Sequence, residues 1–252
     1  MCKNKNNRMV RRVLKFLLIL GFSVPSFAQE LKIEYHSIVT NILSEEAKER
    51  FSKDEIGQMQ LKANENPPKE IYTLLIKGKK SSFTYVDRIN NQQDQKTFDI
   101  RYTPAGLGTT YHDLENKLQK KDIGEIYGKN YVALDSLTDW NWKITQEHKE
   151  ILGVEVIKAI TKNEESDEIT AWFSPEFNFS HEPAEYWGLP GLILEVERKK
   201  TNGTILYTAI SIDKSKKKKF KLKENQKGIE IRESQINDLY EQGRLQRMKL
   251  ES

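Results

Sequence analysis

Four histidines are the side chains in this sequence best suited to acid–base or metal chemistry. A zinc site commonly pairs histidines at short spacings, and no pair here stands at i, i+2 or i, i+4. A three-histidine site would have to be assembled from distant segments, so we predict no metal and expect surface or hydrogen-bonded histidines. The four residues are His36, His112, His148 and His181.

Nucleophile and acid–base motifs give no positive signal. No serine stands in a Gly-x-Ser-x-Gly turn, and no Ser-x-x-Lys arrangement has a suitable setting. The acidic stretch at 164–168 lacks the spacing of a calcium loop and is typical of a solvated hairpin tip. We therefore predict no catalytic residue and no cofactor. A hydrolase whose site is assembled from distant residues stays open as an alternative, because geometry decides catalysis.

Aromatic side chains indicate binding rather than catalysis. Trp142, Trp172 and Trp187 are candidate lining residues of an apolar groove on a curved sheet. Packing of the same rings in the core is the more ordinary interpretation, because large aromatic rings dominate protein cores.

A lysine-rich run over 214–223 is the most strongly charged segment of the chain. One interpretation is contact with an anionic surface such as lipid headgroups. The other is a charged edge strand or loop, in which lysines prevent edge-to-edge pairing. Phe220 and Leu222 alternate with lysines, which favours the second interpretation.

The first 28 residues read as a secretory signal peptide. Arg11, Arg12 and Lys15 precede an apolar stretch from Phe16 to Val24, and the small residues of Ser26-Phe27-Ala28 predict cleavage before Gln29. Nine apolar residues are too few for a membrane span, which needs roughly 20. We expect an exported protein, periplasmic in the first instance, with outer-membrane association or release from the cell as alternatives, and no transmembrane segment in the mature chain.

Removal of this leader changes the charge and the cysteine content. The leader holds six of the 41 basic residues and no acid, so 35 basic and 37 acidic residues remain, a net charge of −2. A nucleic-acid-binding protein is therefore not expected. The only cysteine, Cys2, leaves with the leader, so the mature chain holds no disulfide and no thiol nucleophile.

The mature chain predicts a mainly β fold. Leu192, Leu194 and Val196 alternate with Glu195 and Glu197, as in a strand with one buried face. Similar runs predict strands at 31–39, 71–77, 81–87, 142–144, 154–161, 169–174, 192–198 and 204–212, with less sharply bounded extended pieces at 98–103, 109–120 and 130–134.

Helices are predicted at two places. Ser44 with two glutamates behind it resembles a helix start, and the polar stretch to Lys62 has a weak apolar side. A last helix is expected near Ser234–Lys249. Because strand follows strand through short turns, we predict one domain over residues 29–252. Its fold is a curved antiparallel sheet or half-barrel with one or two packed helices, including a C-terminal helix.

The most distinctive motif is a hexapeptide that runs from Gly188 to Ile193. Pro190 fixes its own φ and Gly191 can adopt φ > 0, so the pair predicts a type II turn after which Leu192 begins a strand. The glycine spacing is wrong for a phosphate-binding loop, so a tight corner that seats a core strand is expected. The six residues are Gly188, Leu189, Pro190, Gly191, Leu192 and Ile193.

The hexapeptide resembles the GLPGLI family of exported bacterial proteins. Further similar landmarks follow in the family's order: Trp142-Lys143-Ile144, Gly153, Lys158-Ala159 and the run from Ala171 to Glu176. The resemblance implies an exported β-rich protein and carries no known activity, cofactor or catalytic residue. We expect a non-enzymatic protein that binds an apolar or peptide ligand or an envelope protein. A purely structural envelope component is an open alternative.

Overall fold

The computed structural model places most of the chain after residue 29. The described residues are 30–87, 105–106, 108–126, 128–177, 180–181, 183–214, 220–223, 225 and 227–242. The expected leader, the predicted extended piece at 98–103 and Lys216–Lys219 lie outside them.

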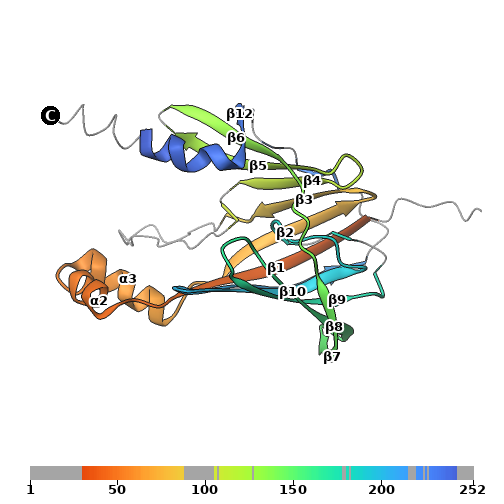
Figure 1. The fold of residues 1–252 in the computed structure, drawn as a ribbon, viewed down its shortest axis with the longest axis horizontal. Helices are drawn as coiled ribbons and strands as arrows, with labels where there is room; N and C mark the ends of the chain where they lie inside the picture. Colours follow the sequence, from red (N-terminus) through yellow and green to blue (C-terminus); the bar gives the residue numbers. More distant parts are fainter. Residues whose placement is uncertain are drawn as a thin grey trace, which may run out of the picture.

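One sheet of twelve strands forms the body of the molecule (Figure 1), and its spatial order is β12-β6-β5-β4-β3-β2-β1-β11-β10-β9-β8-β7. Every neighbouring pair is antiparallel except the short parallel pair of β12 and β6. The mainly β class is therefore confirmed. The strands are β1 (Glu30–Asn41), β2 (Glu70–Lys77), β3 (Lys80–Tyr85), β4 (Thr109–Asp113), β5 (Leu118–Ile126), β6 (Lys129–Ser136), β7 (Lys143–Ile151), β8 (Val154–Lys162), β9 (Glu168–Ser174), β10 (Leu192–Lys200), β11 (Gly203–Asp213) and β12 (Ile229–Ile231).

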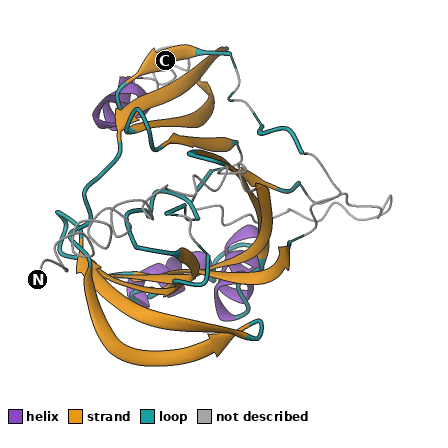
Figure 2. Ribbon diagram, turned by 90° about the vertical axis from the view of Figure 1, so that its right-hand side faces the viewer, coloured by secondary structure: helices purple, strands orange, loops and turns teal. Residues whose placement is uncertain are grey.

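The sheet bends strongly without closing into a barrel (Figure 2). Buried side chains alternate along β1 and β2, as the apolar periodicity predicts, and they meet buried residues of β8 to β11 in one core. At the centre Tyr72 stacks on Phe83, with ring centroids 4.8 Å apart, and Tyr207 meets both rings edge-on. The predicted half-barrel is thus confirmed as an open, curved sheet.

The predicted piece at 109–120 is two strands and not one. β4 ends at Asp113, and β5 begins at Leu118 after a four-residue turn. The Asp113 carboxylate accepts hydrogen bonds from the backbone N–H groups of Glu115 and Asn116, which stabilises the turn. Lys117 adopts φ 51° there, which periodicity alone does not reveal.

The predicted helical stretch from Ser44 to Lys62 is a pair of helices, α2 (Glu45–Phe51) and α3 (Glu55–Glu65). Ser44 caps α2 as predicted, with its hydroxyl accepting from the N–H of Ala47 at 3.2 Å. A second cap, Asp54, accepts from the N–H of Gly57 at 2.7 Å and starts α3 in a new direction. A Cβ on Gly57 would lie 2.6 Å from the carbonyl carbon of Phe51, so the close approach of the helices requires glycine.

The C-terminal helix is confirmed within the described residues. A 3₁₀ turn, η1 (Glu233–Gln235), leads into an α-helix over 236–242. The remainder of the predicted helix, 243–249, lies outside the described residues. No helix in the part of the chain that the structure describes is long and apolar enough to cross a membrane.

The hexapeptide forms a tight corner, but the predicted type II turn is wrong. Gly188, and not Gly191, adopts a positive φ of 95°. The N–H of Gly191 donates to the Leu189 carbonyl at 2.9 Å, a three-residue turn around Pro190. Gly191 is required for a different reason, because a Cβ there would lie 2.7 Å from the carbonyl carbon of Ser174. Leu192 begins β10 as predicted.

Candidate binding site at the helical hairpin

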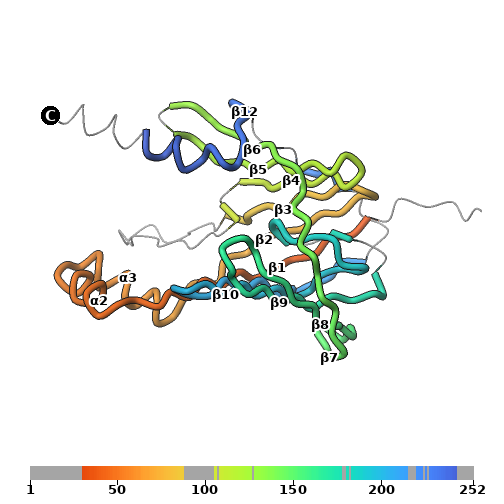
Figure 3. Tube along the Cα trace, viewed as in Figure 1, coloured from red at the N-terminus to blue at the C-terminus, as the bar shows by residue number. Residues whose placement is uncertain are grey.

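Helices α2 and α3 form a hairpin inserted between two neighbouring antiparallel strands. The tube in Figure 3 leaves β1, passes through both helices and returns into β2, and the hairpin lies beyond the end of the sheet (Figures 1 and 3). Short loops suffice to join neighbouring antiparallel strands. No residue of α2 is buried, and Gly57 is the only buried residue of α3. The hairpin therefore adds surface to the molecule rather than core.

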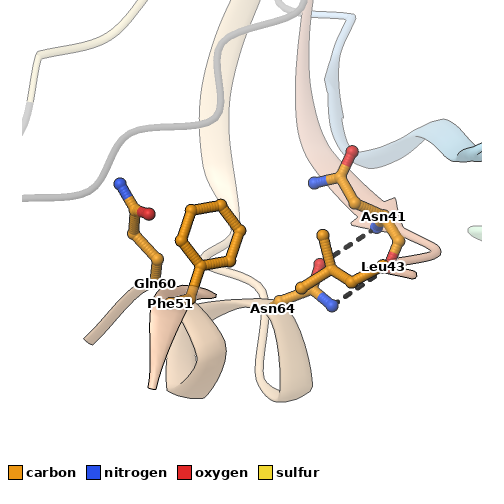
Figure 4. Close-up of a pocket in the computed structure, with 5 residues that line it drawn as sticks. All are labelled: Asn41, Leu43, Phe51, Gln60 and Asn64. Atoms are coloured by element: carbon orange, nitrogen blue, oxygen red, sulfur yellow. Dashed lines mark hydrogen bonds between the residues drawn. The ribbon is translucent and has the colours of Figure 1, made fainter. Parts of the chain in front are cut away.

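A pocket with a volume of ≈ 240 Å³ lies where the hairpin joins β1. Its lining combines three carboxamides with two apolar side chains, and none of the five carries a charge (Figure 4). We call these residues the hairpin pocket: Asn41, Leu43, Phe51, Gln60 and Asn64.

Asn64 fixes the hairpin to the end of β1. Its Oδ1 accepts from the backbone N–H of Asn41 at 3.1 Å, and its Nδ2 donates to the Asn41 carbonyl at 3.0 Å (Figure 4). β2 pairs with β1 only as far as Ser37. Beyond that pair, the Asn64 carboxamide provides the hydrogen-bond donor and the acceptor for the backbone of Asn41. On the side of β1 that faces β2, a side chain thereby bonds the last residue of the strand, while β11 pairs with it on the other side.

Apolar residues beside the pocket face solvent. Ile42 is 72% exposed and Ile56 is 52% exposed, whereas large apolar side chains in this protein are mostly buried. Ile56, Gln60 and Asn64 follow one another at i, i+4 spacing and so lie along one stripe of α3. Of the apolar side predicted for this stretch, Phe51 and Met59 are half-buried in the hairpin, where α2 and α3 contact each other, while Ile56 is exposed.

The candidate groove tryptophans do not lie together on one open surface. The indole N–H of Trp142 donates to the carbonyl of Trp187 at 2.7 Å, and the indole of Trp187 donates to the Thr138 carbonyl. Trp140 packs between Trp142 and Tyr186 and donates to the Glu185 carbonyl at 3.1 Å. These rings bind the hexapeptide region to the segment before β7.

Trp172 lies on the opposite face of β9 from Ala171 and Phe173, which are fully buried. There the ammonium group of Lys149 lies 4.3 Å from the centre of its ring and also pairs with Glu195 at 2.6 Å. Trp172 therefore contacts Lys149, whereas Trp142 and Trp187 bond to each other.

The hexapeptide region is also held by a partly buried arginine, Arg198 of β10. Its guanidinium contacts Asp167 at 2.7 Å, Glu165 at 2.9 Å and Glu185 at 3.6 Å. Burial raises the pKa of the neighbouring Tyr186 hydroxyl, while Arg198 opposes that shift. The acidic stretch at 164–168 is exposed as predicted except at Asp167, which is buried and pairs with the partly buried Arg198.

The four histidines fall into two groups. His148 on β7 is exposed and its Nδ1 lies 2.9 Å from a Glu155 carboxylate oxygen, and His36 lies partly buried on β1. His112 and His181 are each only 1% exposed. Within the described ranges, no three His, Cys, Asp or Glu side chains gather as a metal-ligand set.

The lysine-rich run is described only in part. Phe220 and Leu222 are half-buried and alternate with the exposed Lys221 and Lys223, as predicted, but they form no strand. The N–H of Lys223 donates to the Ser82 hydroxyl at 3.2 Å, so this stretch lies on β3.

Comparison with known proteins finds a family model similar to the central part of the chain. Residues 117–195 match the model of a family described as protein of unknown function (Porph_ging). The match includes the hexapeptide and all of the further landmarks on which the GLPGLI resemblance rests, while the GLPGLI name itself stays a prediction. No curated protein matches the chain.

Solved structures with a similar fold include PNGF-II in two crystal forms. The P21 form has 19% sequence identity and a TM-score of 0.53, and the C2 form has 18% and 0.52. Each covers 86% of this chain, and this chain spans 34% of PNGF-II. At this identity the likeness shows a shared fold and nothing about activity.

Sequence reasoning missed the hairpin pocket as a binding site. Asn41, Gln60 and Asn64 belong to no motif, and their distance along the chain hides the contact between β1 and α3. The sequence offered one weak indication of a binding site. A polar helical stretch with an apolar side stands between two strands that need only a turn to connect them.

Proposed function

We propose that this chain is an exported, non-enzymatic envelope protein that binds a protein partner through the hairpin pocket and its exposed neighbours Ile42 and Ile56. The observation that carries the proposal is the exposure of these isoleucines beside a pocket on helices that contribute almost nothing to the core. Exposed apolar residues clustered on an inserted element are typical of interaction sites.

The chemistry of the pocket favours a peptide-like ligand group. Carboxamides donate and accept hydrogen bonds as peptide groups do, and Phe51 and Leu43 offer an apolar wall. A volume of ≈ 240 Å³ is smaller than most small-molecule sites and suits one side chain of a partner. We therefore expect an uncharged partner segment that inserts one apolar side chain.

The sequence of the first 28 residues supports export. A single domain is proposed to follow residue 28. The basic n-region, the short apolar stretch and the small residues before Gln29 predict a cleaved leader. N-terminal sequencing of the protein from the periplasmic fraction should begin at Gln29. Recovery of the intact chain from the cytoplasm would contradict export while leaving the binding site untouched.

The hydrolase alternative gains no support from the buried histidines. Ser81 lies opposite His112 in the strand register, but its hydroxyl makes no hydrogen bond within the described chain. A serine nucleophile needs a base within hydrogen-bond reach, which this pair does not provide. A purely structural envelope component remains the rival, and it would not need an apolar hairpin surface.

Site-specific photo-crosslinking tests the proposal. A photoreactive amino acid at position 42 or 56 should crosslink one envelope protein in intact cells. The same group at Leu152, which is 48% exposed in the β7–β8 turn, is the matched control and should not. With the probe at position 56, I42S should abolish the adduct, and with the probe at position 42, I56S should do the same. Neither variant should change the melting temperature. L152S should leave the adduct from either position intact. Equal crosslinking from all three positions would contradict a hairpin-specific partner.

A further inference from the structure

Two of the three carboxamides that line the hairpin pocket are available to a ligand. The Asn64 carboxamide is occupied, because it bonds both backbone groups of Asn41. The side chains of Asn41 and Gln60 make no hydrogen bond within the part of the chain that the structure describes, and both residues are half-buried. Figure 4 shows these two carboxamides on either side of the Phe51 ring. The pocket therefore offers two donor–acceptor pairs beside an aromatic ring.

The bond between Asn64 and Asn41 shows how a carboxamide in this site holds an extended main chain. Its oxygen accepts from the N–H and its nitrogen donates to the carbonyl of a single residue at the end of β1. A residue of an antiparallel strand presents both groups to the same side, so one carboxamide can satisfy both. Gln60 carries the same group on a longer side chain and can bind an extended residue in the same way.

The stripe of α3 that carries Gln60 repeats at nearly the spacing of an extended chain. Ile56, Gln60 and Asn64 are each four residues apart, which is about 6 Å along the helix axis. Alternate residues of a strand, whose backbone groups point to the same side, are about 6.6 Å apart. Because β1 ends at Asn41, the extended chain that meets Asn64 does not continue to Gln60. A segment of another chain can supply that extended residue.

The free carboxamides also decide which conformation of a bound segment they can recognise. In a helix the backbone N–H and C=O groups are bonded to one another, so a helical segment has none to give to Gln60. An extended segment leaves these groups free and turns alternate side chains to opposite faces. One apolar side chain can then lie against Phe51 and Leu43. A charged side chain would find no ionic partner among the lining residues.

We propose that the hairpin pocket binds its partner through the main chain of an uncharged, extended segment, with Gln60 and Asn41 bonded to its peptide groups and one apolar side chain beside Phe51. This inference rests on the proposed function and adds the conformation of the bound segment and the groups that recognise it. Main-chain hydrogen bonds supply affinity whatever the sequence, so the sequence of the segment matters chiefly at the inserted residue.

A blocked tripeptide tests this recognition chemistry directly. N-acetyl-Ala-Leu-Ala N-methylamide is uncharged and has one large apolar side chain. It should shift the side-chain amide signals of Asn41 and Gln60 in nitrogen–proton correlation spectra. The signal of Gln58, which is exposed on the same helix and does not line the pocket, should stay in place. Failure of the tripeptide to move either pocket signal would overturn the proposal.

Changes on both sides of the contact identify the hydrogen bonds. Replacing the peptide N–H groups one at a time by ester oxygens should weaken binding about tenfold at one position or more, the size of one hydrogen bond. Q60L should weaken it by at least about tenfold, and Q58L is the matched control that should bind as the wild type does. Equal affinities for the amide and every ester, or for Q60L and the wild type, would overturn main-chain recognition.

Photo-crosslinking separates this inference from the proposed function. Q60L should keep the melting temperature of the wild type, because Gln60 has no side-chain hydrogen bond to lose within the described chain, and it should reduce the adducts from positions 42 and 56. Adducts that persist unchanged in Q60L would overturn main-chain recognition and leave the partner site standing. A wild type that binds the tripeptide as expected but forms no adduct would support main-chain recognition and contradict the envelope partner.

Discussion

The Asn64 carboxamide binds both backbone groups of Asn41, at 3.1 Å and 3.0 Å, four residues beyond Ser37, at which the β1–β2 ladder ends. This single contact joins α3 to the sheet at the point where the hairpin pocket opens. It explains how two helices with almost no buried residues hold a defined position.

Asn64→Ala should therefore destabilise the protein by about 1–2 kcal/mol, because two hydrogen bonds to a partly buried backbone are lost. Urea unfolding measures this change, and partner crosslinking from position 42 should fall with it. Gln58→Ala on the same helix is the control. Gln58 is exposed and bonds only the Ser52 carbonyl, so it should cost less than about 0.5 kcal/mol. Equal losses in the two variants would show that Asn64 is not an anchor.

Gly191→Ala should destabilise far more than Gly153→Ala. At Gly191 the added Cβ meets the Ser174 carbonyl, and the backbone of two buried strands must move, which costs about 3 kcal/mol or more. At Gly153, φ is 73° and no atom lies within 4 Å of an added Cβ, so only the backbone penalty of about 1–2 kcal/mol applies. Thermal unfolding of both variants separates the two reasons for glycine; equal shifts would refute the close-approach explanation.

Arg198→Met should cost about 3–5 kcal/mol, because it leaves the Asp167 carboxylate, 8% exposed, without its cation. The hexapeptide region should loosen first, since Glu185 loses the same partner. Lys199→Met is the matched control: that lysine is 60% exposed and pairs with Glu197 at 3.4 Å, so its loss should be below about 1 kcal/mol. A mild effect at Arg198 would mean that the aromatic contacts alone hold this region.

Stability should fall as the pH drops from about 6.5 to about 4. The pKa values of His112 and His181 are both lowered to about 4, mainly because the two imidazoles are buried. Below pH 6.5 the unfolded chain therefore binds protons that the folded chain does not, and the loss is complete near pH 4. Each histidine contributes roughly 3 kcal/mol over this window.

Urea unfolding at pH 7 and pH 5 measures that loss. The double variant H112Q/H181Q should lose much less stability than the wild type between these values, and H148Q should behave as the wild type. An identical loss in the double variant would assign the acid sensitivity to other groups.

Local periodicity was sufficient to predict most of the sheet. The alternation in 192–198 specifies β10 because a strand exposes its two faces in turn, and Gly78 marks the β2–β3 hairpin because it supplies a φ of 62°. Ser44 likewise predicts the start of α2, since capping depends on the next three residues only.

Contacts between distant segments depended on the curvature of the sheet. His112 and His181 are 69 residues apart, and nothing in their spacing shows that one pairs with β3 while the other bonds the β2–β3 turn. The same holds for Asn41 with Asn64, and for Trp142 with Trp187. Residue type and spacing determined a β-rich chain with an inserted helical stretch. Only the bending of twelve strands decided which polar groups are buried together and which apolar groups face solvent, because burial depends on the whole fold.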